Sequence, residues 1–156
     1  MKECLIGCDN AGVDLKRQIV RFLKEKGETV VDIGVNSEDD DTPYPEIARR
    51  AAELIIGSGY SKQGILICGT GIGMAITANK FPGVYAALCH DGYSAERARL
   101  SNDANIITMG ARVIGPELAK SIVATWFALE FKPGRSSDKL ALLKKFERDN
   151  FSASQR

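Results

Sequence analysis

The residues with the clearest capacity for chemistry lie in one segment, GILICGTGIGMAI, at residues 64–76. An apolar run typical of a buried strand ends at Cys68, and a glycine-rich turn and a helical pattern follow directly. Such a turn exposes backbone amides and a helix N-terminus, which can bind an anion and stabilise a thiolate. The glycine spacing alone is weak evidence, because GTGIG lacks the GxGxxG pattern of a dinucleotide site and can serve packing only.

A second turn near the start of the chain is expected at the same edge of the sheet. The segment GCDNAG, residues 7–12, places Asp9 and Asn10 after the first apolar run. Asp9 can cap the following helix or contact a ligand, and both interpretations remain open. Cys4 and Cys89 are interpreted as small buried hydrophobic residues, the usual environment of a free cysteine.

The elements that must position these residues follow from the hydrophobic pattern. Short apolar runs alternate with segments of helical period, which is typical of a parallel sheet with helices on both faces. Strands are predicted near residues 4–8, 29–33, 64–68, 84–89 and 105–108. Helices are predicted near 12–26, 45–58, from the turn after Cys68 to about 80, and at 92–100, 116–131 and 137–150. The last helix needs a neighbouring surface to cover.

Length and composition limit the possible classes of protein. We expect one domain at residues 1–150 and a frayed tail at 151–156. The 21 basic and 20 acidic side chains nearly cancel, so no overall field attracts nucleic acid or a membrane surface. No apolar run is long enough to span a bilayer, and the acidic loop at 35–42 is interpreted as a solvated turn rather than a metal site. Four cysteines without a CxxC pair, and an opening without a signal pattern, predict the reducing cytoplasm.

Several further motifs occur in the order and spacing of one known family. They are GCDNAG (7–12), YP (44–45), ILICGTGIG (65–73), NKFPG (79–83), YSAERARLSNDAN (93–105), MGARVIG (109–115) and GR (134–135). Over nearly the whole chain they resemble the type B ribose-5-phosphate isomerases and the galactose-6-phosphate isomerase subunits. The resemblance implies a Rossmann-like three-layer αβα sandwich, and a homodimer or homotetramer with its site between two subunits. It also implies an aldose-ketose isomerase of a small sugar phosphate, without metal or other cofactor.

The same resemblance implies roles for individual residues. Cys68 matches the family's catalytic base, and Thr70 matches its partner at the substrate oxygens. The loop that cradles the enediolate matches Gly69, Gly71, Ile72 and Gly73. Substrate contacts match Asp9, Asn10, Ser101, Asn102 and Arg112, and phosphate contacts match Arg135 and Lys139.

Three positions depart from the family pattern. Asn10 and Ser101 stand where histidines are usual, and the second of these histidines opens the sugar ring. Lys139 keeps the charge of a phosphate-binding residue but lacks the bidentate geometry of arginine. A tetrose 4-phosphate cannot close a five-membered ring, because its 4-oxygen is esterified. D-Erythrulose 4-phosphate is therefore a rival to ribose 5-phosphate, and residues 90–115 also resemble the erythrulose-4-phosphate isomerases.

His90, the single histidine, has two possible roles, and two other functions of the chain are also considered. His90 follows the strand at 84–89 and is either a surface or hydrogen-bonded residue, or a substitute for the missing histidine or a phosphate contact. A non-catalytic sugar-phosphate-binding subunit of a hetero-oligomer is favoured by the lost histidines, and opposed by Cys68, Thr70 and Arg135. A nucleotide-dependent oxidoreductase is opposed by the glycine spacing and by the lack of an acidic residue about 20 positions further on.

Overall fold

The computed structural model describes residues 2–153 and places a five-stranded parallel sheet at the centre of the molecule. The strands are β1 (Cys4–Cys8), β2 (Val30–Asp32), β3 (Gln63–Cys68), β4 (Ala86–Leu88) and β5 (Ile106–Gly110). Their order is β2-β1-β3-β5-β4, and each neighbouring pair is parallel. All residues of β1, β3 and β5 are buried, as expected for apolar strands covered on both faces.

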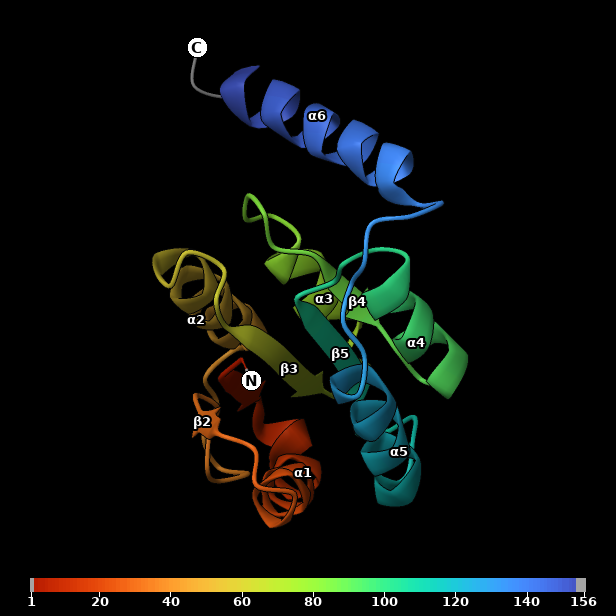
Figure 1. The fold of residues 1–156 in the computed structure, drawn as a ribbon. Coiled ribbons are helices and arrows are strands. Elements are labelled where there is room, and N and C mark those ends of the chain that lie inside the picture. Colours follow the sequence, from red (N-terminus) through yellow and green to blue (C-terminus); the bar gives the residue numbers. More distant parts are fainter. Residues whose placement is uncertain (1, 154–156) are drawn as a thin grey trace.

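Helices on both faces of this sheet complete three layers. Within the described part of the chain they are η1 (Asn10–Gly12, a 3-10 helix), α1 (Val13–Glu25), α2 (Tyr44–Gly57), α3 (Ile72–Ala78), α4 (Gly92–Leu100), α5 (Pro116–Phe127) and α6 (Ser137–Ala153). On one face α1 and α4 contact α5, and on the other α2 contacts α3 (Figure 1). The predicted α/β fold with five parallel strands in a Rossmann-like three-layer sandwich is therefore confirmed.

The core lies where the apolar stripes of the helices meet the sheet. Ile19 and Leu23 of α1, and Ile122 and Trp126 of α5, are fully buried. A spacing of four residues places each pair on one face of its helix. Burial of such side chains stabilises the fold by about 25 cal/mol per Å² of apolar surface, and it orients the loops at the helix ends.

The helix α5 ends at Phe127, although the sequence predicted a helix as far as Phe131. The amide of Leu129 bonds to the Trp126 carbonyl three residues back, which tightens the last turn. Pro133 prevents any continuation, because it lacks an N–H and disfavours helical backbone in the residue before it. The segment 128–136 therefore runs in extended and turn conformations to α6.

The strand β4 is shorter than the predicted run of residues 84–89. An amide side chain also bonds the backbone just before it begins: Asn105 Oδ1 accepts from the Tyr85 N–H at 2.9 Å. Asn79 likewise pairs with both backbone groups of Ala86, at 2.8 and 2.9 Å. Backbone bonds to β5 occur on both sides of β4, from the Ile106 N–H to the Tyr85 carbonyl and from the Cys89 N–H to the Thr108 carbonyl, but regular pairing covers only three residues.

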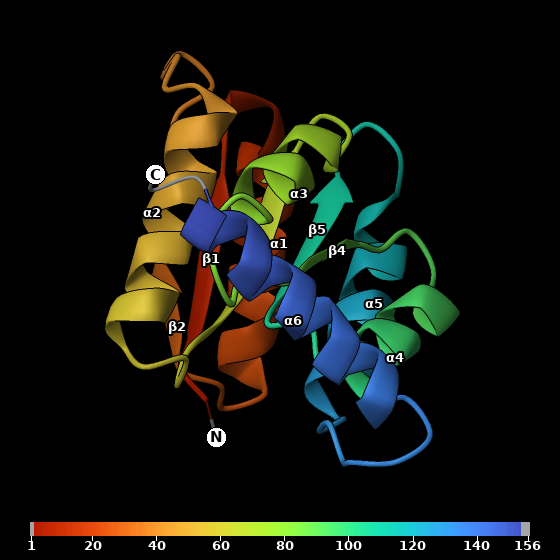
Figure 2. The same ribbon diagram turned by 90° about the horizontal axis from the view of Figure 1, so that it is seen from above.

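The helix α6 lies on the outer side of the layer formed by α2 and α3 (Figures 1 and 2). It continues through Ala153, three residues past the predicted end. Residues 154–156, the rest of the predicted frayed tail, lie outside the described residues. In the described range 2–153, none of the helices is long and apolar enough to cross a bilayer.

Candidate active site

The neighbouring strands β1 and β3 end where the helices that follow them diverge. The helix α1 leaves β1 toward the face that also holds α5, and α3 leaves β3 toward the face that holds α2. The loops after two such strands separate and leave a crevice at their carboxyl ends, which is the usual ligand site of open parallel sheets. Asp9 follows β1 and Cys68 ends β3, so the fold brings together both segments identified in the sequence.

The Cys68 side chain lies beneath the glycine-rich turn and is 5% exposed. The backbone N–H of Gly71 donates to Cys68 Sγ at 3.1 Å. Hydrogen bonds to ionised acceptors are stronger than those to neutral ones, so this donor interacts most favourably with a negatively charged sulfur. The geometry therefore suits a thiolate that faces the turn.

The turn itself has a shape that requires glycine at position 71. Gly71 has φ +78°, and a Cβ there would lie 2.8 Å from the carbonyl carbon of Met109 and 2.7 Å from Leu88 Cδ1. Thr70, just before it, is exposed, and its hydroxyl oxygen accepts from the Ile72 N–H at 3.4 Å. The chain thus passes close to β5 and leaves the Thr70 hydroxyl accessible at the edge.

Asp9 and Arg112 bring opposite charges to this edge. Asp9 Oδ1 accepts from the Ala11 N–H at 3.1 Å, so the predicted capping role is confirmed, at η1 rather than α1. The Arg112 guanidinium lies over Gly69, because a Cβ on that glycine would be 3.5 Å from its Nη1. Burial raises the pKa of Asp9, and hydrogen bonds from Ala11 and Gly12 and then the charge of Arg112 partly offset this rise.

Tyr44 also contacts the site, although the sequence reasoning did not include it among the site residues. It begins α2, and its ring packs directly on Gly73, where any Cβ would collide with it. Tyr44 is 39% exposed as a whole residue, so part of it covers α3 and part remains open to solvent. The YP pair at 44–45 was the signal in the sequence, but spacing alone did not show that the ring reaches the glycine turn.

His90 lies at the same edge, one strand away from Cys68. Its Nε2 accepts from the Gly110 N–H at 2.9 Å, and Gly110 pairs in register with Cys68. The histidine is half-buried, so it fits the hydrogen-bonded interpretation, with Nε2 in its unprotonated form. A role in catalysis or phosphate binding stays a prediction. Asn10, at the start of η1, is exposed beside this edge.

The other predicted contacts lie away from Cys68 in the chain. Ser101 and Asn102 follow α4, which runs back to the amino edge so that β5 can begin there. Ser101 accepts from Arg97 Nη1 at 3.5 Å, and Asn102 is exposed. Arg135 and Lys139 are exposed around the start of α6. One chain therefore groups Asp9, Cys68–Gly73 and Arg112, whereas Ser101 and Asn102 lie toward the opposite edge of the sheet, and Arg135 and Lys139 lie at α6, outside the layer of α2 and α3.

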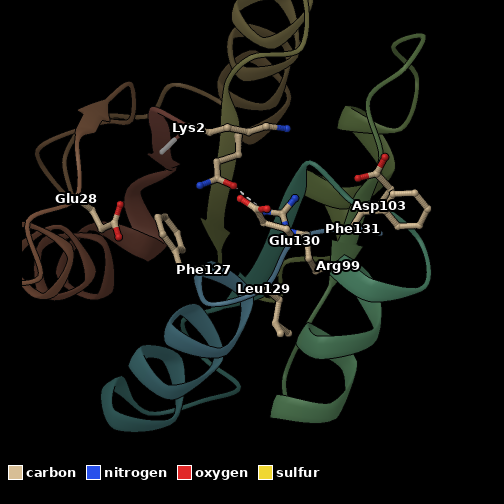
Figure 3. A pocket seen from close by; sticks show the side chains of 9 residues that line it. Lys2, Glu28, Arg99, Asp103, Phe127, Leu129, Glu130 and Phe131 are labelled. Carbon is tan, nitrogen blue, oxygen red and sulfur yellow. Dashed lines mark hydrogen bonds between the residues drawn. The ribbon is translucent and has the colours of Figure 1, made fainter. Parts of the chain in front are cut away.

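A buried arginine holds the segment that carries Asn102. Arg99 Nη1 donates to the Ala104 carbonyl at 2.8 Å, and its Nη2 donates to Gln63 Oε1 at 2.6 Å. The guanidinium stacks on Trp126, with its carbon 4.0 Å from the ring centroid. Arg99 and Gln63 border a cavity of about 420 Å³ that also touches Glu130 (Figure 3). The cavity lies at the start of β3, at the opposite end of the strand from Cys68.

The comparisons with known proteins decide the family. The pattern described as Ribose/Galactose Isomerase matches residues 4–143. The chain belongs to the ribose/galactose isomerase family. It is similar to ribose-5-P isomerase B of Listeria innocua, with 51% identity over 93% of this chain and 97% of the relative. It is also similar to D-erythrulose-4-phosphate isomerase of Pectobacterium atrosepticum, with 48% identity over 94% of this chain and 96% of that one.

A solved structure supports the same assignment. Ribose-5-phosphate isomerase B of Clostridium thermocellum superimposes with a TM-score of 0.89 at 41% identity, and the match covers 95% of this chain and 99% of that one. The predictions of the ribose/galactose isomerase family and of a sugar-phosphate isomerase are therefore confirmed. The site residues expected for that activity remain predictions. Asp9, Cys68–Gly73 and Arg112 lie at one edge of the sheet, and Ser101, Asn102, Arg135 and Lys139 lie elsewhere.

Proposed function

We propose that the chain is an aldose-ketose isomerase of the ribose 5-phosphate/ribulose 5-phosphate type, with Cys68 as the base. The observation that carries this proposal is the Cys68 sulfur at the carboxyl end of β3, bonded to the Gly71 amide under the glycine turn. The names of the two relatives support the class of substrate, a small sugar phosphate. Ligands of open parallel sheets bind at such strand ends.

The reaction moves a proton between two neighbouring carbons. The Cys68 thiolate takes the proton from C2 of the aldose, the C–H electrons form the C1–C2 double bond, and the negative charge goes to O1. Thr70 relays the O2 proton to O1, and the Cys68 thiol returns its proton to C1 to give the ketose. The amides of Gly69–Gly73 and the Arg112 guanidinium stabilise the enediolate, because donors placed where charge develops lower the barrier.

A second copy of the chain completes the site in this proposal. The six residues of β3 span about 20 Å, which exceeds the length of a five-carbon sugar phosphate. Asn102, toward the opposite edge of the sheet, therefore reaches a substrate at Cys68 only from another subunit, and we propose the same for Arg135, just before α6. The exposed apolar side chains of α6, Leu142, Leu143 and Phe146, support an interface at this helix. We accordingly propose a homodimer or homotetramer.

The identity of the sugar depends on the residue that replaces the ring-opening histidine. Ser101 is half-buried and accepts from Arg97, and a serine hydroxyl is a poor proton shuttle at neutral pH. An acyclic tetrose phosphate avoids this requirement, and one of the similar enzymes is named for D-erythrulose 4-phosphate. D-Erythrulose 4-phosphate is therefore our second candidate substrate.

Two wider features are proposed on the same basis. One sheet and one contiguous apolar cluster support a single domain over residues 1–150. All four cysteines are free, which supports a location in the reducing cytoplasm. Reduced thiols also suit the proposed base, because a disulfide at Cys68 would abolish it.

Replacement of the proposed base tests the mechanism. Cys68→Ala is expected to remain folded and oligomeric while its turnover falls at least ~100-fold, the usual effect of losing an acid-base group. Cys4→Ala is the matched control: it removes an equally buried thiol at the other end of the sheet and should keep turnover near the wild-type level. Near-normal turnover in Cys68→Ala contradicts the mechanism.

A substrate panel separates the candidates. We expect the wild-type chain to turn over D-ribose 5-phosphate or D-erythrulose 4-phosphate, and the ratio of kcat/KM identifies the preferred sugar. A strong preference for the tetrose indicates that the ring-opening step has been lost. Binding of both sugar phosphates without turnover of either favours the alternative of a non-catalytic subunit.

A further inference from the structure

Glu147 attaches α6 to the loop before β4 with both of its carboxylate oxygens. Its Oε1 accepts from the Gly83 N–H at 3.0 Å, and its Oε2 accepts from the Tyr85 hydroxyl at 2.9 Å. Burial raises the pKa of Tyr85, and the bond to Glu147 raises it further, so the phenol remains a donor at neutral pH. The donors lie more than 60 positions away in the sequence, so these bonds join separate parts of the fold.

The rest of this side of α6 is loosely packed. A cavity of about 410 Å³ lies between α6 and the body of the chain, bordered by Lys144 and Arg148 of the helix and by Tyr60 of the body. The apolar side chains Leu142, Leu143 and Phe146 are exposed, and Leu140 is buried near the start of the helix. Apolar burial of Leu140 is therefore one attachment of α6, and the Glu147 bonds are a second one that sets the direction of the helix axis.

Hydrogen bonds to the rest of the chain also fix the loop that contains Gly83 and Tyr85, the two partners of Glu147. Asn105 accepts from the Tyr85 N–H at 2.9 Å and donates to the Gly83 carbonyl at 2.8 Å. The Tyr60 hydroxyl donates to the Pro82 carbonyl at 3.1 Å. Asn105 stands three positions after Asn102, so one set of bonds connects α6 with the segment that carries Asn102.

We infer that Glu147 is a positioning residue, whose carboxylate fixes Lys139 of α6 relative to Asn102. Lys139 lies two turns before Glu147, about 12 Å along the helix axis, so a tilt of α6 moves its ammonium group. The inference rests on the proposed function, in which Lys139 binds the substrate phosphate and Asn102 contacts the sugar. Glu147 itself does not touch the substrate and acts through the helix.

Kinetics on a graded set of variants tests this role. Glu147→Ala is expected to raise KM about tenfold while kcat stays within about threefold, because a binding contact is misplaced and the base is untouched. Tyr85→Phe keeps the Gly83 bond and should raise KM less. Glu147→Gln retains one acceptor oxygen and should restore much of the affinity. Asp149→Ala, the matched control, removes only an exposed ion pair with Lys145 on the same helix and should leave KM unchanged.

Hydrogen exchange gives a readout that does not depend on turnover. In Glu147→Ala the Gly83 amide and the later turns of α6 should exchange faster than in Asp149→Ala, because the docking bonds are gone. Unchanged exchange, or a KM equal to that of Asp149→Ala, overturns the inference. If the wild-type chain has no isomerase activity, the proposed function is contradicted instead. The exchange data then test the docking role alone: faster exchange in Glu147→Ala supports it, and unchanged exchange overturns it.

Discussion

At the scale of single residues, Asp9 shows how a site position can reduce stability. Its carboxyl is half-buried at the end of β1, and burial raises its pKa above the ordinary value near 3.8. Because the folded-state pKa exceeds the unfolded one, the contribution to stability is fully present below the unfolded pKa. It is lost as the pH rises through the folded value. At neutral pH the charged Asp9 carboxylate therefore lowers the free energy of unfolding. A charged group that costs stability in this way is consistent with the proposed contact to a ligand.

We predict that Asp9→Asn stabilises the fold and impairs the reaction. Asparagine can still cap η1 through its side-chain oxygen, but it carries no charge to desolvate. Thermal unfolding at neutral pH should give a higher Tm than the wild type, and the difference should shrink as the pH falls through the raised folded pKa and be smallest below the ordinary value of 3.8. Asp14→Asn, at an exposed position of α1, should give no such gain. An unchanged kcat/KM in Asp9→Asn contradicts a substrate contact.

At the scale of elements, the turn between β3 and α3 depends on a backbone conformation that side chains do not allow. We predict that Gly71→Ala destabilises the fold by at least about 2 kcal/mol, because the positive φ and the contact with the Met109 backbone both penalise a Cβ. The displaced amide should also lower isomerase activity. Gly57→Ala, where a Cβ meets nothing within 4 Å, should be neutral or stabilising in denaturant unfolding. Equal stability of the two variants contradicts this account.

The elements differ in how far their sequence determines them. The strands β1, β3 and β5 and the helix α1 were predicted within one or two residues, because their apolar patterns are strong. The helix α4 was predicted as closely although its apolar pattern is weak, and Asp91 caps its start. The end of α5 was wrong by four residues, since its apolar period continues past the last helical turn. The packing of Tyr44 on Gly73 and the Glu147 bonds join residues distant in sequence, which periodicity cannot reveal.

The site was predictable only in part for the same reason. The pattern placed Asp9 and Cys68 at strand ends on the same edge of the sheet, and the fold does bring them to one edge, on neighbouring strands. Asn102, Arg135 and Lys139 came from the resemblance alone, and nothing in their local spacing indicates the distance that separates them from Cys68. That distance is a property of the strand length and of the return path of α4 and α5.

At the scale of the whole molecule, a site shared between two copies predicts complementation between inactive variants. In the proposed homodimer, each site would take Cys68 from one copy and Arg135 from the other, so Cys68→Ala and Arg135→Gln should each impair both sites. A mixed dimer has one site with both defects and one intact site. Random mixing of the two variants should restore about a quarter of the wild-type activity. Size-exclusion chromatography and turnover before and after mixing measure this, and no recovery despite exchange of subunits contradicts the shared site.

The two outer strands of the sheet determine how such copies can meet. β2 and β4 contain three residues each, and Asn79 already bonds both backbone groups of Ala86 on β4. Short, capped edges offer few free backbone groups, so a second sheet gains little by adding to either side. In the proposed oligomer we therefore expect copies of this chain to join through side chains on helices rather than through a continuous intermolecular sheet, and the same short edges disfavour ordered aggregation.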